Sequence, residues 1–187
     1  MPDFRPLPDA TLDAIAGKIG ERLSAPMTSS ALGSPPAATL NETMEVWMLG
    51  ADALLQPTDD LLQLAKPTGR WHHQIKSGGQ VVGYARSMPL GPAPGDWSVR
   101  EVSKSGASKA IDDAIKWIDA NVHDDSQVRM LSVPAYHVTA FWLVENAGDR
   151  IVVAVAPFAK LIQTNHIYTA KEFLDALRAL PVVKGIS

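Results

Sequence analysis

Hydrophobic residues recur along this chain with two different periods, which predict two kinds of element. Where apolar residues stand three or four positions apart we expect amphipathic helices, and this spacing covers residues 9–23, 106–122 and 169–180. Where β-branched and aromatic residues form short runs we expect strands, and such runs cover residues 44–49, 97–102, 127–133, 136–144 and 150–156. Thr169 and Glu172 add a capping box at the start of the last helix.

Residues 70–88 carry the clearest hairpin signal in the chain. Trp71, His73 and Ile75 alternate with polar residues, and residues 76–79 (KSGG) supply a turn because glycine accepts positive φ. Strands that follow one another through tight turns pair antiparallel. The pattern therefore predicts one α+β domain, with an antiparallel or mixed sheet of about five to seven strands and helices packed against it.

The strand expected at residues 136–144 is apolar on both faces. Val138, Ala140 and Trp142 share one face with Tyr136, whereas Phe141 lies on the other. We therefore expect cover on both sides of this strand. The helices at 106–122 and 169–180 can cover one side, and the other side needs the N-terminal helix, a second sheet layer or another subunit.

The N-terminal segment, residues 1–39, is predicted to be separate from the globular α+β domain at residues 40–187. It combines the first amphipathic helix with a Ser-, Ala- and Pro-rich connector over residues 24–39. Such a helix could pack on its own domain or on a neighbouring subunit. It is therefore a candidate arm for oligomer contacts.

Composition and charge exclude several classes of protein. The 187 residues carry a net charge of −3 and no run of lysines and arginines, so we expect no nucleic-acid partner. The absence of cysteine excludes disulfides, a thiolate nucleophile and cysteine-ligated metals. We find no signal peptide and no apolar run long enough to cross a membrane, and expect a cytoplasmic protein without membrane contact.

No catalytic or metal motif is recognisable among the polar residues. The chain contains no GxSxG or SxxK motif, no HxH pair and no HExxH motif. His72 and His73 are adjacent on a strand, so their side chains should point to opposite faces and cannot readily share a metal. We expect no metal site and no cofactor, and the absence of these motifs favours a protein without catalytic activity over an enzyme.

Two clusters remain as candidate binding residues. The first is Arg70, Trp71, His72 and His73, with Arg70, His72 and Gln74 on one face as a recognition surface or simply a solvated strand face. The second is Tyr136 and His137 in the core strand. The leading hypothesis is a non-catalytic binding or assembly module, forming a homo-oligomer or binding another protein. The alternative is an enzyme or a domain that binds a small molecule, with a His- and Arg-containing pocket beside the sheet.

Overall fold

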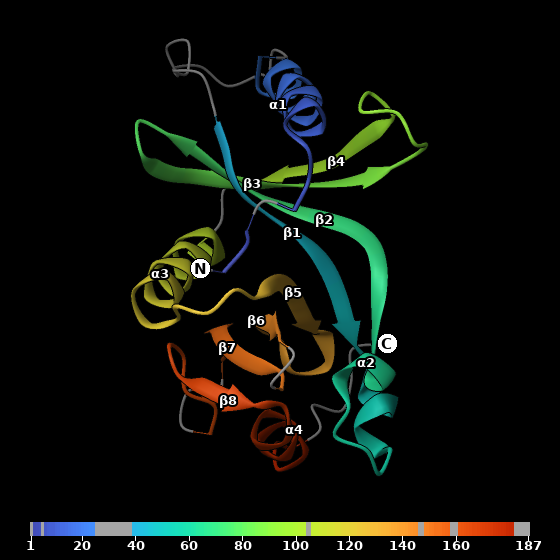
Figure 1. The fold of residues 1–187 in the computed structure, drawn as a ribbon, viewed down its shortest axis with the longest axis vertical. Helices are drawn as coiled ribbons and strands as arrows, with labels where there is room; N and C mark the ends of the chain where they lie inside the picture. Colours follow the sequence, from blue (N-terminus) through green and yellow to red (C-terminus); the bar gives the residue numbers. More distant parts are fainter. Residues whose placement is uncertain are drawn as a thin grey trace. The chain divides into compact units, whose positions relative to one another are not determined.

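The computed structural model confirms the α+β class (Figure 1) and describes residues 2–4, 6–24, 39–103, 106–145, 148–157 and 161–181. Most of the predicted connector, residues 25–38, lies outside this range. The helices are α1 (Asp9–Ser24), α2 (Leu61–Leu64), α3 (Gly106–Asn121) and α4 (Ala170–Arg178), with short 3-10 turns η1 (Ala51–Leu55) and η2 (Pro134–Tyr136). The strands are β1 (Thr39–Leu49), β2 (Ala65–Ser77), β3 (Gln80–Pro89), β4 (Trp97–Ser103), β5 (Gln127–Val133), β6 (Val138–Val144), β7 (Arg150–Val155) and β8 (Ile167–Thr169).

The strands are hydrogen-bonded in the order β4-β3-β2-β1-β5-β6-β7-β8. This sheet of eight strands is larger than the five to seven that we expected, because β8 has only three residues and gives no periodic signal. The pairs β2–β3, β3–β4, β5–β6, β6–β7 and β7–β8 are antiparallel, whereas β1 and β5 run parallel with Trp47 opposite Leu131. The sheet is therefore mixed.

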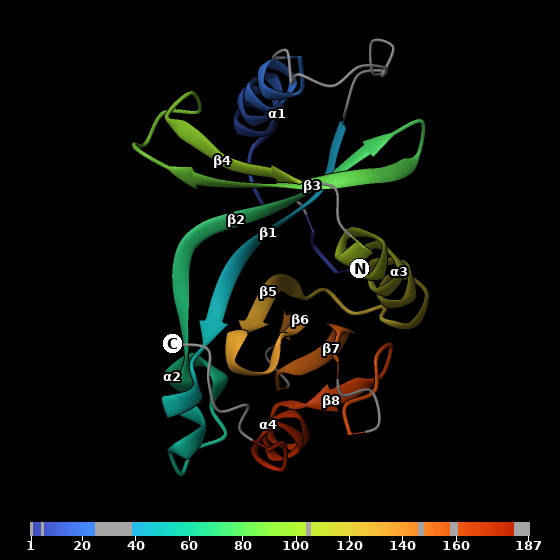
Figure 2. The same cartoon turned by 180° about the vertical axis from the view of Figure 1, so that it is seen from behind.

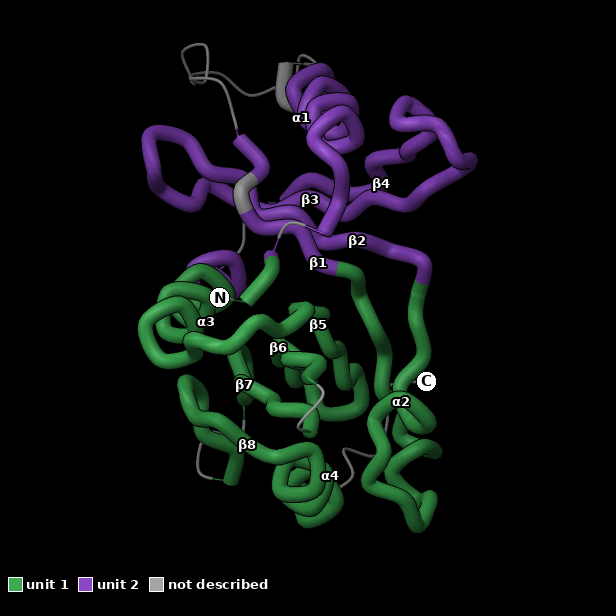
Figure 3. The backbone as a smooth tube through the Cα atoms, in the orientation of Figure 1, with its two compact units in different colours: residues 1–3, 45–68, 110–187 green, residues 4–44, 69–109 purple. Residues whose placement is uncertain are grey.

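By compactness the chain divides into two units, which Figure 3 colours separately. Unit 1 comprises residues 1–3, 45–68 and 110–187, and unit 2 comprises residues 4–44 and 69–109. β1 and β2 each pass from one unit into the other. The units do not follow the division that we expected at residue 39, because α1 belongs to unit 2 with β3 and β4.

In unit 2, α1 packs on its own chain. Its buried residues Ile15 and Ile19 form one apolar cluster with Ile75 of β2, Ala85 of β3 and Val99 of β4, and Figures 1 and 2 show the helix beside β4. The helix also covers the edge strand, since the Lys18 Nζ donates to the carbonyl oxygens of Gly95 (2.7 Å) and Trp97 (2.6 Å). The outer edge of a terminal strand otherwise presents open backbone groups.

The predicted hairpin is confirmed as β2 and β3. Trp71 pairs with Ser87 at one end and Ser77 with Gln80 at the other. The turn places Gly78 at φ +57° and Gly79 at φ +79°, a region that side chains with a Cβ rarely adopt. The two glycines are therefore required by this turn.

In unit 1, both faces of β6 are covered within the chain. The Trp142 face forms a core with Leu131 and Phe173, so it lies under α4. Phe141 and Leu143, on the opposite face, are also fully buried, and α3 lies on that side (Figures 1 and 2). The two long helices therefore lie on different sides of the strand, and not on one side as we expected. No second subunit is needed to cover β6.

The start of β6 differs from the prediction. The sequence placed Tyr136 and His137 in the strand, but Pro134 to Tyr136 form η2 and the strand begins at Val138. Pro134 at the first position favours this short helical turn. His137 then reverses the chain with φ +52°, a left-handed conformation that a strand cannot contain.

The capping box of α4 is confirmed and gives a stability prediction. The Thr169 Oγ1 accepts a hydrogen bond from the Glu172 backbone N–H (3.2 Å), and the Glu172 carboxylate accepts one from the Thr169 N–H (2.8 Å). Thr169→Ala should therefore lower the free energy of unfolding by about 1 kcal/mol in chemical denaturation. The control Thr164→Ala, at an exposed position, should change it by less than about 0.5 kcal/mol. Equal effects of the two variants would contradict a role for the cap.

Candidate functional site

β2 carries two adjacent histidines in unit 2, and both are buried. His72 is 2% exposed and His73 0%, and the neighbouring Gln74 is also buried. Only Arg70 of the polar face that we expected on this strand is exposed to solvent. The proposed recognition surface of Arg70, His72 and Gln74 is therefore wrong as a set, because two of its three side chains cannot reach a partner.

His73 lies in a chain of hydroxyl groups. Its Nδ1 is 3.1 Å from the Thr43 Oγ1 on β1, and its Nε2 is 2.6 Å from the Ser87 Oγ on β3. A serine beside an imidazole is the first half of a nucleophile and base pair. Here the third group is a hydroxyl and not a carboxylate, Ser87 is only 1% exposed, and burial lowers the pKa of His73 to about 4. The arrangement fits a buried structural network better than a catalytic one.

His72 occupies the other face of β2. Its ring stacks on that of Tyr84, with 5.2 Å between the ring centroids. Neither ring nitrogen has a hydrogen-bond partner among the residues that the structure describes. Burial lowers the pKa of His72 to about 3, with further lowering by the positive charges of His73 and Arg86. His72 is therefore neutral at physiological pH.

Beside these residues lies a surface cavity of about 440 Å³, which we call the arginine hollow. Its lining comes from Arg70 of β2, from Arg86, Ser87 and Met88 of β3, and from Arg100 and Glu101 of β4. Arg86 pairs with Glu101 and Ser87 with Val99, so the register shifts and Arg100 is the extra residue of a bulge. Bulges re-aim side chains in this way. The hollow thus brings three guanidinium groups to one surface.

The described lining of the arginine hollow is richer in basic than in acidic side chains. Its carboxylate, Glu101, accepts a hydrogen bond from the Tyr84 hydroxyl (2.5 Å) and lies 3.5 Å from the Arg86 Nη1. Burial and this hydrogen bond raise the pKa of Tyr84, so its hydroxyl stays protonated as a donor. Among the described residues, the lining of the hollow contains three arginines and one carboxylate. Guanidinium groups bind carboxylates and phosphates in a bidentate geometry, so the hollow can bind an anionic group.

The other predicted site residues do not join Arg70 in the hollow. Trp71 packs edge to face against Trp97, with 5.9 Å between centroids. Tyr136 belongs to the core of unit 1, and His137 is exposed on the same unit. Arg86 and Arg100 were missed, although Arg86 shares a face of β3 with Tyr84 and Met88 and the hairpin register places it opposite His72.

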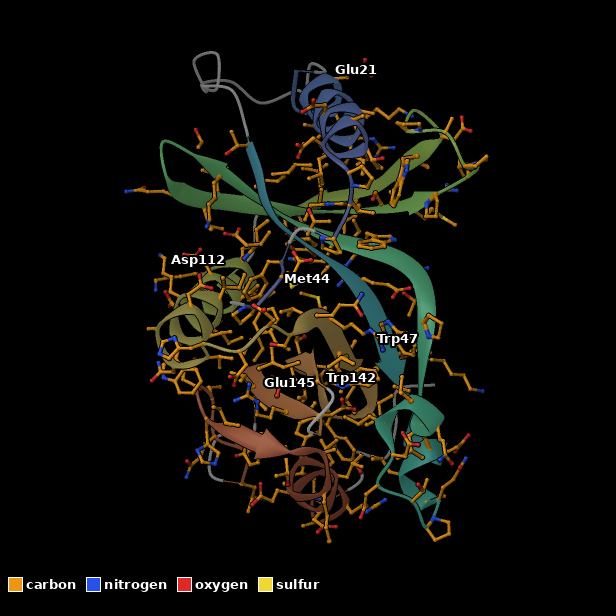
Figure 4. The ribbon with its side chains drawn as sticks, viewed as in Figure 1. Glu21, Met44, Trp47, Asp112, Trp142 and Glu145 are labelled. Carbon is orange, nitrogen blue, oxygen red and sulfur yellow. The ribbon has the colours of Figure 1, made fainter. Side chains whose placement is uncertain are left out.

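Unit 1 contains a second aromatic cluster. Trp47 and Trp142, labelled in Figure 4, meet edge to face at 5.3 Å. The Arg129 guanidinium lies over both rings, 4.4 Å from the Trp47 centroid and 4.9 Å from that of Trp142. Burial lowers the pKa of Arg129. Four of the five tryptophans therefore serve in two packed pairs rather than at a recognition surface.

Comparisons with protein-family models, curated proteins and solved structures found no match for this chain. Within the described ranges, no three His, Asp or Glu side chains lie close enough together to hold a metal ion. The helices in those ranges include none that is long and apolar enough to cross a membrane.

Proposed function

We propose that this protein is a non-catalytic binding module whose arginine hollow binds carboxylate groups on the surface of a protein partner. The observation that carries the proposal is the convergence of Arg70, Arg86 and Arg100 on one hollow beside Glu101. Arginine is enriched at protein interfaces and lysine is depleted there. Met88 adds an apolar wall, which a protein partner can also cover.

The alternative, an enzyme or a domain that binds a small molecule, has less support. It required at least two of the side chains of Arg70, His73, Tyr136 and His137 to converge on one pocket. His73 is enclosed by Thr43 and Ser87, Tyr136 is in a different unit, and His137 is exposed. His73 is therefore poorly suited as a general base near neutral pH, because its pKa is low and a substrate cannot reach its ring.

Binding of poly-L-glutamate tests the proposal, because this polymer offers carboxylates without any specific fold. In titration calorimetry at low salt the protein should bind it, and Arg70→Gln/Arg100→Gln should weaken binding about tenfold or more. Both side chains are exposed, so the variant should keep its stability.

The matched control is Lys66→Gln/Lys171→Gln, which removes the same charge at two exposed positions outside the arginine hollow. It should bind poly-L-glutamate almost as well as the unchanged protein. If the two double variants lose affinity equally, binding depends on overall charge alone and the assignment to the hollow is wrong.

A further inference from the structure

Two basic side chains of α1 bind backbone carbonyl oxygens along β4, and helix and strand both belong to unit 2. We propose that this contact, the edge cap, is autoinhibitory: it keeps the outer edge of β4 closed to strand addition, and a second copy of the chain pairs there when the cap is removed. β4 is the end strand of the sheet in the described part of the chain. Such an edge can accept a further strand through its backbone groups.

The edge cap consists of Lys18 and Arg22. The Asp96 carbonyl oxygen accepts a hydrogen bond from the Leu90 N–H (2.6 Å), so it points toward the β3 side. Carbonyl groups alternate along an extended strand, so that of Trp97 points outward, where the Lys18 Nζ donates to it at 2.6 Å. The same ammonium group donates to the Gly95 carbonyl oxygen (2.7 Å), and the Arg22 Nη1 donates to that of Arg100 (3.5 Å).

Both cations lie on the side of α1 that faces the sheet. Ile15 and Ile19 are fully buried against the sheet, and Lys18 and Arg22 each follow one of them by three positions. Residues three apart share one side of a helix, and the side that faces a core is ordinarily apolar. Long basic side chains can pack their stems there while their charged ends reach the margin. The sequence therefore places two donors along the edge of β4 (Figures 1 and 2).

The edge cap is not needed to satisfy the carbonyl groups. The contact with Gly95 is exposed, so water could serve its oxygen equally well. What the cap changes is access, because an added strand must first displace Lys18 from two carbonyl oxygens. Lysine at a sheet edge and a helix laid over that edge are both means by which proteins prevent pairing between sheets.

A second copy is the partner that fits this edge by symmetry. Two identical strands that pair antiparallel across a two-fold axis each meet the same surface on the other, so one contact closes both edges. Removing the cap from the chain opens the edge in both copies at once. The strand at the other end of the sheet, β8, has only three residues and offers fewer backbone groups.

The variant Lys18→Gln/Arg22→Gln tests the proposal, because glutamine is polar but shorter than either side chain. In sedimentation velocity this variant should dimerise at least about tenfold more tightly than the unchanged protein. Lys66→Gln/Lys171→Gln removes the same charge at two exposed positions and should behave as the unchanged protein does. Lys18→Arg, which keeps a charged donor, should also leave association unchanged.

Hydrogen exchange and a peptide locate the contact. Dimerisation should increase the protection of amides in residues 95–103, and a peptide of this sequence (GDWSVREVS) should bind the double variant. The same peptide with Val99→Pro, which lacks a backbone N–H, should bind at least about tenfold more weakly.

Circular dichroism checks that the double variant is folded. If it is not, Arg22→Gln, at an exposed position, is measured in its place. A folded variant that associates no more tightly than the unchanged protein and binds no peptide overturns the proposal, as does a dimer without added protection in β4. Peptide binding without dimerisation would support the edge cap and overturn the second copy as partner.

Discussion

Leu143→Ala is expected to lower the free energy of unfolding by about 2–5 kcal/mol, and Phe141→Ala by about 3–5 kcal/mol. Both side chains are fully buried on one face of β6. Truncation there removes apolar contacts and leaves a cavity, because neighbouring strands fix the backbone on both sides. Chemical denaturation followed by circular dichroism measures the change, and an unaltered slope against denaturant would show that compactness is kept.

A matched leucine separates burial from residue type. Leu55, at the end of η1, is 84% exposed, so Leu55→Ala should change the free energy of unfolding by less than about 0.5 kcal/mol. Equal losses in Leu55→Ala and Leu143→Ala would contradict the assignment of the Phe141 face to the core.

The buried apolar residues could be predicted, because the spacing of hydrophobic residues indicates which side of a helix or strand is buried. Ile15 and Ile19 of α1, and Phe141 and Leu143 of β6, are buried as their spacing indicates. Local chemistry was equally informative where the backbone imposes a requirement, as at the glycine pair of the β2–β3 turn. These signals depend on residues close together in the sequence.

The burial of His72 and Gln74 could not be predicted in the same way. Alternation assigns two side chains to the same face of a strand, but it does not reveal whether that face is covered. For His72 the cover includes the ring of Tyr84, which the hairpin brings from β3. From the sequence alone, polar residues that alternate along a strand therefore indicate a face exposed to solvent.

The arginine hollow was harder still to predict from the sequence, because it depends on the register of two strand pairs. Arg86 becomes a neighbour of Arg70 only through the register of the hairpin, and Arg100 through a bulge in the next pair. A bulge changes which residues face each other, and no residue of β4 marks its position in the sequence. The parallel contact of β1 with β5 was hidden for the same reason, because it joins segments far apart in the chain.

The buried histidines also predict a strong dependence of stability on pH. An unfolded chain protonates histidine near pH 6.5, whereas the folded protein holds the pKa of His72 at about 3 and that of His73 at about 4. Between these values the unfolded state binds more protons, so stability is complete above about pH 6.5 and is lost as the pH falls toward the folded values. From pH 7 to pH 5 the two histidines together should remove on the order of 4 kcal/mol.

Thermal unfolding across this pH range, with single variants, assigns the effect to its source. His72→Phe keeps an aromatic ring against Tyr84 but cannot be protonated, so about half of the loss between pH 7 and pH 5 should disappear. His137→Gln, which alters an exposed histidine, should leave the pH dependence as it is in the unchanged protein. If His72→Phe loses as much stability between pH 7 and pH 5 as the unchanged protein, protonation of His72 is not what destabilises the fold. That result would assign the loss to groups such as His73 and not to the carboxylates, because pairing depresses carboxylate pKa values, as it does for Asp175 beside Lys171, so they act only at lower pH.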